Sequence, residues 1–275
     1  MTEANIKLLE RIQGLISKAE STEFVEEAEA FMAKAQELLA KYSLSEFDLK
    51  LVKDGQMNDT VKTIAVLISE PCAPAKLQLI GAVARANNVK VVRGQYQKRS
   101  SKNAVPNDWR TKEPMRILSS DNKSVNYRTA WLTGFTRDID AVTMLYTSML
   151  IQINATLAKE DIPAYVNRGT FMGHFIQGFA TTVRVRLAKA KGISEKELID
   201  EARENGHDML PILKSRLEQV EAEYERMWAG NLSTGRGGYN RTSTGGFNAG
   251  STAGGRADIG QKGVGGIGAL GRGGN

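Results

Sequence analysis

The chain has 275 residues, 41% of them apolar, and a net charge of +6, a length that accommodates two small domains or one domain with extensions. No apolar run is long enough to span a membrane and the N-terminus lacks the layout of a signal peptide, so we expect a soluble cytoplasmic protein without a membrane partner. One cysteine, Cys72, and two histidines, His174 and His207, exclude an intramolecular disulfide and argue against thiolate or imidazole metal sites.

Residues 1–55 are predicted to form a helical domain. Apolar side chains recur at three- and four-residue steps in residues 6–20, which indicates a first helix with one buried stripe. Thr22 is a suitable N-cap for a second helix that runs to Tyr42, and Ser45 begins a shorter third helix. The simplest assembly is a helical hairpin closed by the third helix.

This opening segment resembles an N-terminal domain of unknown function that is widespread in bacteriophage and actinobacterial proteins. That family shows Ala-x-Ser-Thr, then Glu-Ala-x-x-Ala-x-x-Lys-Ala-x-x-Leu, then Leu-Ser-x-x-Asp-Leu. The resemblance implies a phage or prokaryotic protein, but it implies no activity because the family has no established one. The matching positions are Ala19, Ser21, Thr22, Glu27, Ala28, Phe31, Lys34, Ala35, Leu38, Leu44, Ser45, Asp48 and Leu49.

Residues 74–228 are predicted to form an α+β domain with long helices. Its first part indicates a helix over 76–88, followed by a strand over 89–94 that is rich in β-branched residues. Two further strands are predicted over 115–120 and 126–135. This order predicts a small antiparallel sheet covered by helices.

The remainder of this domain is predicted to be helical. A helix opened by an aspartate covers residues 141–160, and phenylalanines at helical spacing indicate another over 170–192. A final charged helical stretch over 193–228 is interrupted by Gly206 and Pro211.

The charges are distributed unevenly along the chain. Residues 1–60 hold seven Lys/Arg and twelve Asp/Glu, a balance of −5, whereas residues 85–128 hold eleven Lys/Arg and three Asp/Glu, a balance of +8. Residues 231–275 hold five Lys/Arg and one Asp, a balance of +4. An acidic head followed by a basic middle and a basic tail points to an anionic partner for the basic parts.

The stretch over residues 95–114 is predicted to be an exposed basic loop, since it has several turn residues and no periodicity. Its cations can neutralise phosphates, and its aromatic side chains can stack on unpaired bases. The simpler alternative is a solvated loop anchored by its tryptophan. The candidate nucleic-acid-binding residues in this loop and just before it are Arg93, Tyr96, Lys98, Arg99, Lys102, Trp109, Arg110 and Lys112.

Residues 229–275 are predicted to be a glycine-rich tail, because 16 of the 27 glycines lie in the last 45 residues. Three of its arginines, Arg236, Arg241 and Arg256, resemble those of RGG-type RNA-binding segments. The tail also resembles a C-terminal signature of the same phage and actinobacterial proteins, which makes Gly254, Asp258, Gly260 and Gly271 candidate interaction residues. Three interpretations stay open: disorder, which the composition favours, ordering on a partner, or docking on the chain's own fold.

Function is less constrained than organisation. No nucleophile elbow, P-loop, dinucleotide-binding fingerprint or zinc-protease helix is present, so the sequence favours a nonenzymatic protein without a cofactor or metal. The favoured interpretation is a phage or prokaryotic protein that contacts DNA or RNA through the basic loop and the Arg/Gly tail. The alternatives are a protein-interaction or assembly factor whose tail orders on a partner, and an enzyme whose catalytic residues meet only in the fold. A phage-encoded chain would act in the cytoplasm of the host cell.

Overall fold

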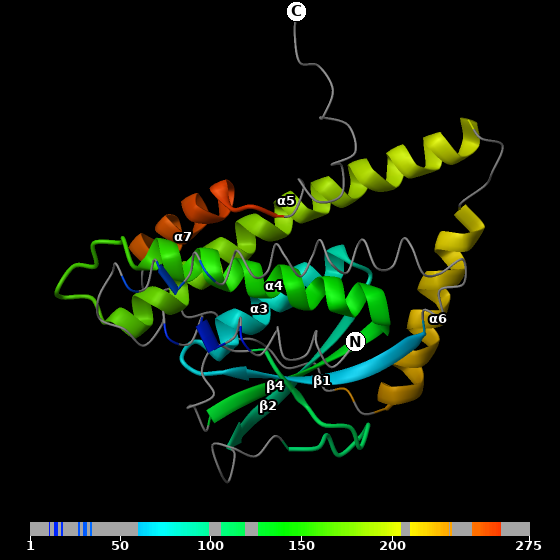
Figure 1. Cartoon of the computed structure of the whole chain (residues 1–275), viewed down its shortest axis with the longest axis horizontal. Coiled ribbons are helices and arrows are strands. Elements are labelled where there is room, and N and C mark those ends of the chain that lie inside the picture. Colours follow the sequence, from blue (N-terminus) through cyan, green and yellow to red (C-terminus); the bar gives the residue numbers. More distant parts are fainter. Residues whose placement is uncertain are drawn as a thin grey trace, which may run out of the picture.

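The protein combines a small sheet with long helices (Figure 1). The computed structural model describes residues 60–98, 106–118, 126–204, 210–230, 232 and 244–259, together with eight positions between residues 11 and 34. Helices pack on both faces of the sheet and enclose two hydrophobic cores. The α+β class expected from the sequence is confirmed.

The sheet has four strands in the order β2-β4-β1-β3. β4 (Asn126–Phe135) pairs antiparallel with both β1 (Val61–Ser69) and β2 (Lys90–Lys98). The short β3 (Arg116–Ile117) adds to β1 in parallel, so the sheet is mixed at that edge and antiparallel elsewhere. β2 is therefore the outer strand of the opposite edge.

β1 is the strand that sequence analysis missed. Residues 65–69 of this strand are all buried, because helices cover the sheet on both faces. A strand buried on both faces loses the alternation of apolar and polar residues that identifies a half-exposed strand. The sheet consequently begins at Val61, before the domain boundary expected at residue 74.

Three helices lie on one face of the sheet. α3 (Ala73–Ala86) and α4 (Thr136–Leu157) cover the strands, and α5 (Arg168–Glu204) packs on α3. α3 has a proline in its first turn, where the missing N–H does no harm. It ends before Asn88, which adopts a left-handed conformation with φ 57°, as expected of asparagine at a helix stop.

The opposite face is covered by α6 (Leu210–Trp228). The C-terminal half of α6 packs on the sheet, and its Trp228 ring meets the Trp131 ring edge-on at 5.1 Å between centroids. The N-terminal half leaves two leucines in solvent, Leu210 at 44% and Leu217 at 50% exposure. α6 therefore carries more apolar surface than the sheet covers.

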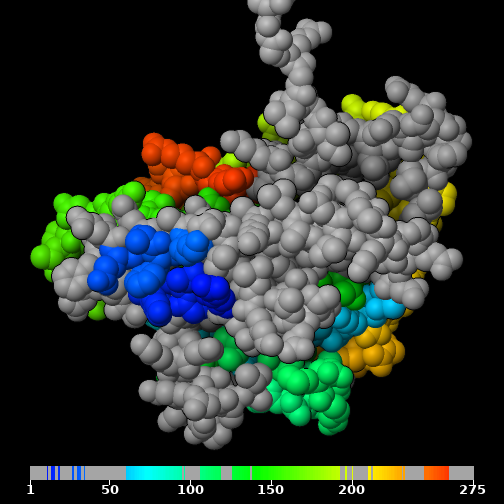
Figure 2. Space-filling view, viewed as in Figure 1, coloured from blue at the N-terminus to red at the C-terminus, as the bar shows by residue number. Residues whose placement is uncertain are grey.

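Part of the glycine-rich tail is a helix docked on the chain's own fold. α7 (Thr244–Arg256) lies alongside the N-terminal half of α5 and forms part of the molecular surface (Figures 1 and 2). Three of its glycines recur every four residues and face backbone carbonyls of α5. Gly246 meets Phe171, Gly250 meets Phe175 and Gly254 meets Phe179.

The approach of these two helices leaves no room for side chains at the contact. A Cβ on Gly246 or Gly254 would lie 2.8 Å from a phenylalanine carbonyl oxygen, and one on Gly250 would lie closer still. Gly178 of α5 faces the backbone of α7 in the same way, since a Cβ added at this position would collide with the backbone at Phe247. Small residues spaced four apart allow helix backbones to approach in this way.

Polar side chains then hold the end of α7. Arg186 donates Nη1 hydrogen bonds to the carbonyls of Gly254 at 2.8 Å and Ala257 at 2.6 Å. Gln152 of α4 accepts from the N–H of Asp258 at 2.7 Å and donates to its carbonyl at 2.9 Å. These bonds satisfy backbone groups that a helix end leaves without partners, and Ile259 is buried in the core beyond them.

The predicted helical hairpin of residues 1–55 falls largely outside the described residues. The eight described positions between residues 11 and 34 are all helical. The ammonium of Lys18 lies 5.7 Å from the centre of the Phe31 ring, so the segments on either side of Thr22 contact each other at that point. Among the described helices, none has the length and apolar character needed to cross a membrane.

Substitution of Gly250 should separate α7 from α5. The Cβ of Gly250→Ala would collide with the backbone at Phe175, so we expect the free energy of unfolding to fall by about 2–3 kcal/mol. Gly255→Ala is the matched control, since nothing lies within 4 Å of its Cβ and alanine favours the helix by about 0.5–1 kcal/mol. Urea denaturation followed by circular dichroism measures both, and shifts in the same direction would contradict the packing described above.

Candidate nucleic-acid interface

A groove of about 600 Å³ follows the free edge of the sheet, between the end of α3, strand β2 and α6. Its walls therefore come from both helical layers, and the edge strand runs between them. The groove is lined by Gly81, Arg85, Asn88, Val89, Lys90, Val91, Arg93, Leu217, Val220 and Glu221.

Two arginines supply the unneutralised charge of this groove. Arg85 comes from the last turn of α3 and Arg93 from β2, and both are exposed. Neither forms an ion pair with any acidic side chain in the described part of the chain. Arg93 extends toward α3 at Gly81, where a Cβ would lie 3.4 Å from its Nη2 atom.

The third cation of the groove is already paired. Lys90 Nζ lies 2.5 Å from a carboxylate oxygen of Glu221 and 5.1 Å from the centre of the Tyr224 ring. Asn88 accepts a hydrogen bond from Lys191 of α5. The available positive charge therefore belongs to the two arginines.

A β-bulge brings Arg93 and Tyr96 to the same face of β2. Arg93 lies opposite Ala130 and Tyr96 lies opposite Arg128, with a register shift between them. Opposed residues of an antiparallel pair share a face, and Ala130 and Arg128 are two residues apart on β4. Without the bulge, residues three apart on a strand would point to opposite faces. Gly94 lies inside this bulge.

Two of the predicted aromatic residues are available at the surface. Tyr96 is 51% exposed, and its hydroxyl donates to Asn126 Oδ1 at 2.6 Å. Trp109 is 59% exposed in the loop. Lys112 is exposed too, in a turn where its φ is 62°. The side chain of Lys98 and the predicted candidates Arg99 and Lys102 lie outside the described residues.

Arg110 is committed to internal contacts. Its guanidinium lies between the rings of Trp109 and Trp228, 4.2 Å and 4.3 Å from their centres. Its Nη1 donates to the carbonyl of Met227 at 2.9 Å. Such a stack is a cation–π arrangement, so Arg110 fastens the loop to the end of α6.

Asp108 fastens the same loop to the sheet. Its carboxylate is fully buried and accepts from the indole N–H of Trp131 at 3.1 Å and from the backbone N–H of Thr111 at 2.9 Å. The neighbours of Trp109 therefore anchor this loop, while Trp109 itself stays on the surface. Residues 106–114 of the predicted basic loop are thus attached to the sheet and to α6. The loop prediction was wrong for residues 95–98, which pair with β4 as the end of strand β2.

Some candidate residues of the tail are exposed, whereas others are packed against the fold. Arg256 is exposed in the last turn of α7 and Gly254 is packed against α5. The Asp258 side chain is exposed although its backbone is held by Gln152. The predicted residues Arg236, Arg241, Gly260 and Gly271 lie outside the described part of the chain.

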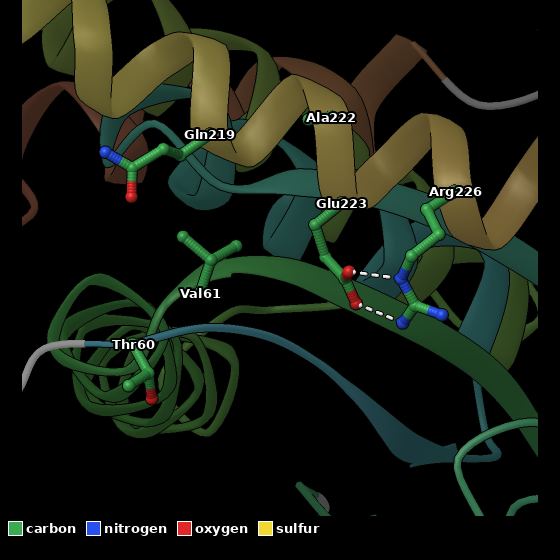
Figure 3. Close-up of a pocket in the computed structure, with 6 residues that line it drawn as sticks. All are labelled: Thr60, Val61, Gln219, Ala222, Glu223 and Arg226. Carbon is green, nitrogen blue, oxygen red and sulfur yellow. Dashed lines mark hydrogen bonds and ion pairs between the residues drawn. The ribbon is translucent and has the colours of Figure 1, made fainter.

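A second hollow of about 500 Å³ lies between α6 and the start of β1 (Figure 3). Figure 3 shows Glu223 and Arg226 facing each other along α6, joined by two hydrogen bonds of 2.7 and 2.8 Å. These hydrogen bonds and the carboxylate charge raise the pKa of Arg226 above its ordinary value. Because the two charges cancel, this hollow offers an anion less than the edge groove does.

Comparison with known proteins concerns the N-terminal segment. Residues 7–46 match a family described as "Protein of unknown function (DUF2786)". This match agrees with the resemblance of the segment to a domain of unknown function. No curated protein and no solved structure matches the chain.

Of the residues that line this groove, only Arg93 was a candidate from the sequence. Arg85 lies in the basic stretch of residues 85–128 but on a helix before the predicted loop, and Lys90 lies within the predicted strand. Leu217 and Glu221 come from a helix far along the chain. No local pattern links these segments, since the sheet edge alone brings them together. In the described residues, no group of three or more His, Cys, Asp or Glu side chains is arranged to hold a metal ion.

Removal of the Asp108 carboxylate should loosen the loop. Asp108→Ala leaves the buried Trp131 indole N–H without an acceptor, so we expect a loss of about 2–3 kcal/mol in the free energy of unfolding. Glu113→Ala, which removes an exposed carboxylate from the same loop, should change it by less than about 0.5 kcal/mol. Urea titrations read by tryptophan fluorescence compare the two. Equal effects would mean that Asp108 does not anchor the loop.

Proposed function

We propose that the chain is a nonenzymatic phage or prokaryotic protein that binds DNA or RNA along the free edge of its sheet. The observation that carries this proposal is the meeting in one groove of two guanidinium groups, Arg85 and Arg93, that have no ion-pair partner among the described residues. They come from α3 and β2, which follow each other in the sequence yet belong to different layers of the fold.

Guanidinium groups suit phosphate because their planar donors match its oxygens, and each phosphate neutralised releases counterions. Both arginines stand on regular elements, so no backbone segment has to be ordered when they bind. Tyr96 supports the proposal, since the bulge places this half-exposed ring on the same face as Arg93. An aromatic ring beside a cation along one strand is suited to a base beside its phosphate.

The alternative function, an assembly factor whose tail orders on a protein partner, has less support than nucleic-acid binding. Its basis was a tail that orders on a partner, but residues 244–259 are docked on α5 and α4 of the same chain. The groove, in contrast, has exposed cations from outside the tail. We therefore place the principal contact at the sheet edge and give Arg256 and Trp109 peripheral roles.

Neutralising the groove arginines should weaken binding and reduce its salt dependence. We expect Arg85→Gln and Arg93→Gln each to lower affinity for labelled DNA or RNA by about tenfold and to reduce the slope of log affinity against log salt by about 1. Arg226→Gln is the matched control, since it removes the same charge from an arginine in the other hollow. Anisotropy across a salt series measures all three. If Arg226→Gln lowered the affinity equally, the losses would reflect the overall charge of the protein and not a binding site in the groove.

Removing the carboxylate of Glu221 should strengthen binding. Glu221→Gln releases Lys90 and removes a negative charge from the groove, so we expect about a threefold to tenfold gain in affinity at low salt. Glu218→Gln provides the comparison, because Glu218 lies on the same helix but pairs with Lys214 and does not line the groove. A Glu221→Gln variant that binds no better than the Glu218→Gln variant would argue against phosphate in this groove.

A further inference from the structure

The groove has an apolar wall that phosphate binding does not use. Leu217 is 50% exposed at this wall, with Val220 behind it. Leu217 is not part of the core that the C-terminal half of α6 forms with the sheet. An exposed leucine at the wall of a cationic groove suits a ligand that is anionic at one end and apolar at the other.

The unneutralised charge and the apolar wall lie on opposite sides of the edge strand β2. Lys90 lies opposite Thr133 on the face that α6 covers, where it meets Glu221 and Tyr224. Arg93 lies opposite Ala130 on the other face, toward α3. The unneutralised charge is thus on the α3 side, while the apolar wall and the neutralised lysine are on the α6 side.

We infer that the groove receives an unpaired nucleotide, with its phosphate at Arg85 and Arg93 and its base against Leu217. This inference rests on the proposed function and names its ligand as single-stranded nucleic acid. A base in a duplex is stacked and paired, so a duplex offers the groove its phosphates but no free base face. An unpaired base brings a face that is apolar enough to cover Leu217. The volume of about 600 Å³ is in the range of pockets that hold a ligand of nucleotide size.

The test compares two leucines on one helix. Leu210 is exposed to 44% and belongs to the same exposed part of α6, but it does not line the groove. Both positions are at the surface, so Leu217→Ser and Leu210→Ser should both leave the fold intact, which circular dichroism checks. Anisotropy with a labelled single strand of about 20 nucleotides and with its duplex, at one low salt concentration, gives four comparisons.

We expect the unaltered protein to bind the single strand about tenfold more tightly than the duplex. Leu217→Ser should weaken single-strand binding by about fivefold and change duplex binding by less than about twofold, whereas Leu210→Ser should change neither. If Leu217→Ser weakens both probes equally or neither, or if the duplex binds as well as the single strand, the inference is overturned while the proposed function stands. Absence of binding to every probe at low salt would overturn both.

Discussion

The architecture depends on β4, which is hydrogen-bonded to β1 on one side and to β2 on the other. Leu132 of this strand belongs to the core beneath α3 and α4, and its neighbour Trp131 belongs to the core beneath α6. Because successive residues of a strand point to opposite faces, one strand fixes the position of both helical layers. The pairing also leaves β2 at the edge. Where the two layers extend past this edge, they enclose the groove.

Local sequence patterns predicted those elements that have a periodic arrangement of apolar residues or a clear start or stop signal. The strand over residues 126–135, the helix stop at Asn88 and the long helices were found because each has its own local signal. The missed strand β1 is covered on both faces, and a continuous apolar run does not distinguish a strand from a buried helix. The two helical segments predicted over 170–205 are one helix, α5, since Gly192 does not interrupt it. A glycine in a helix lowers its stability without ending it.

The candidate site was less predictable because it is assembled from distant segments. Charge density drew attention to the loop after β2, yet within that loop Arg110 is held between two tryptophans. Whether an arginine is free or stacked depends on Trp228, more than a hundred residues later in the chain. The alignment of Arg93 with Tyr96 depends on a register shift near Gly94. There a Cβ would lie 2.7 Å from the Trp131 ring, a tertiary contact that no local pattern contains.

The tail shows why glycine content alone does not decide between order and disorder. Each glycine in a helix costs about 1 kcal/mol relative to alanine, and α7 has five glycines in 13 residues, so this segment has no tendency to be helical in isolation. Three of the same glycines permit the backbone contact with α5, and Arg186 and Gln152 then bind the end of the segment. Helix formation and docking are consequently a single event, because each stabilises the other. Arg256, in the last turn of α7, has a fixed position relative to α5 only when that event has taken place.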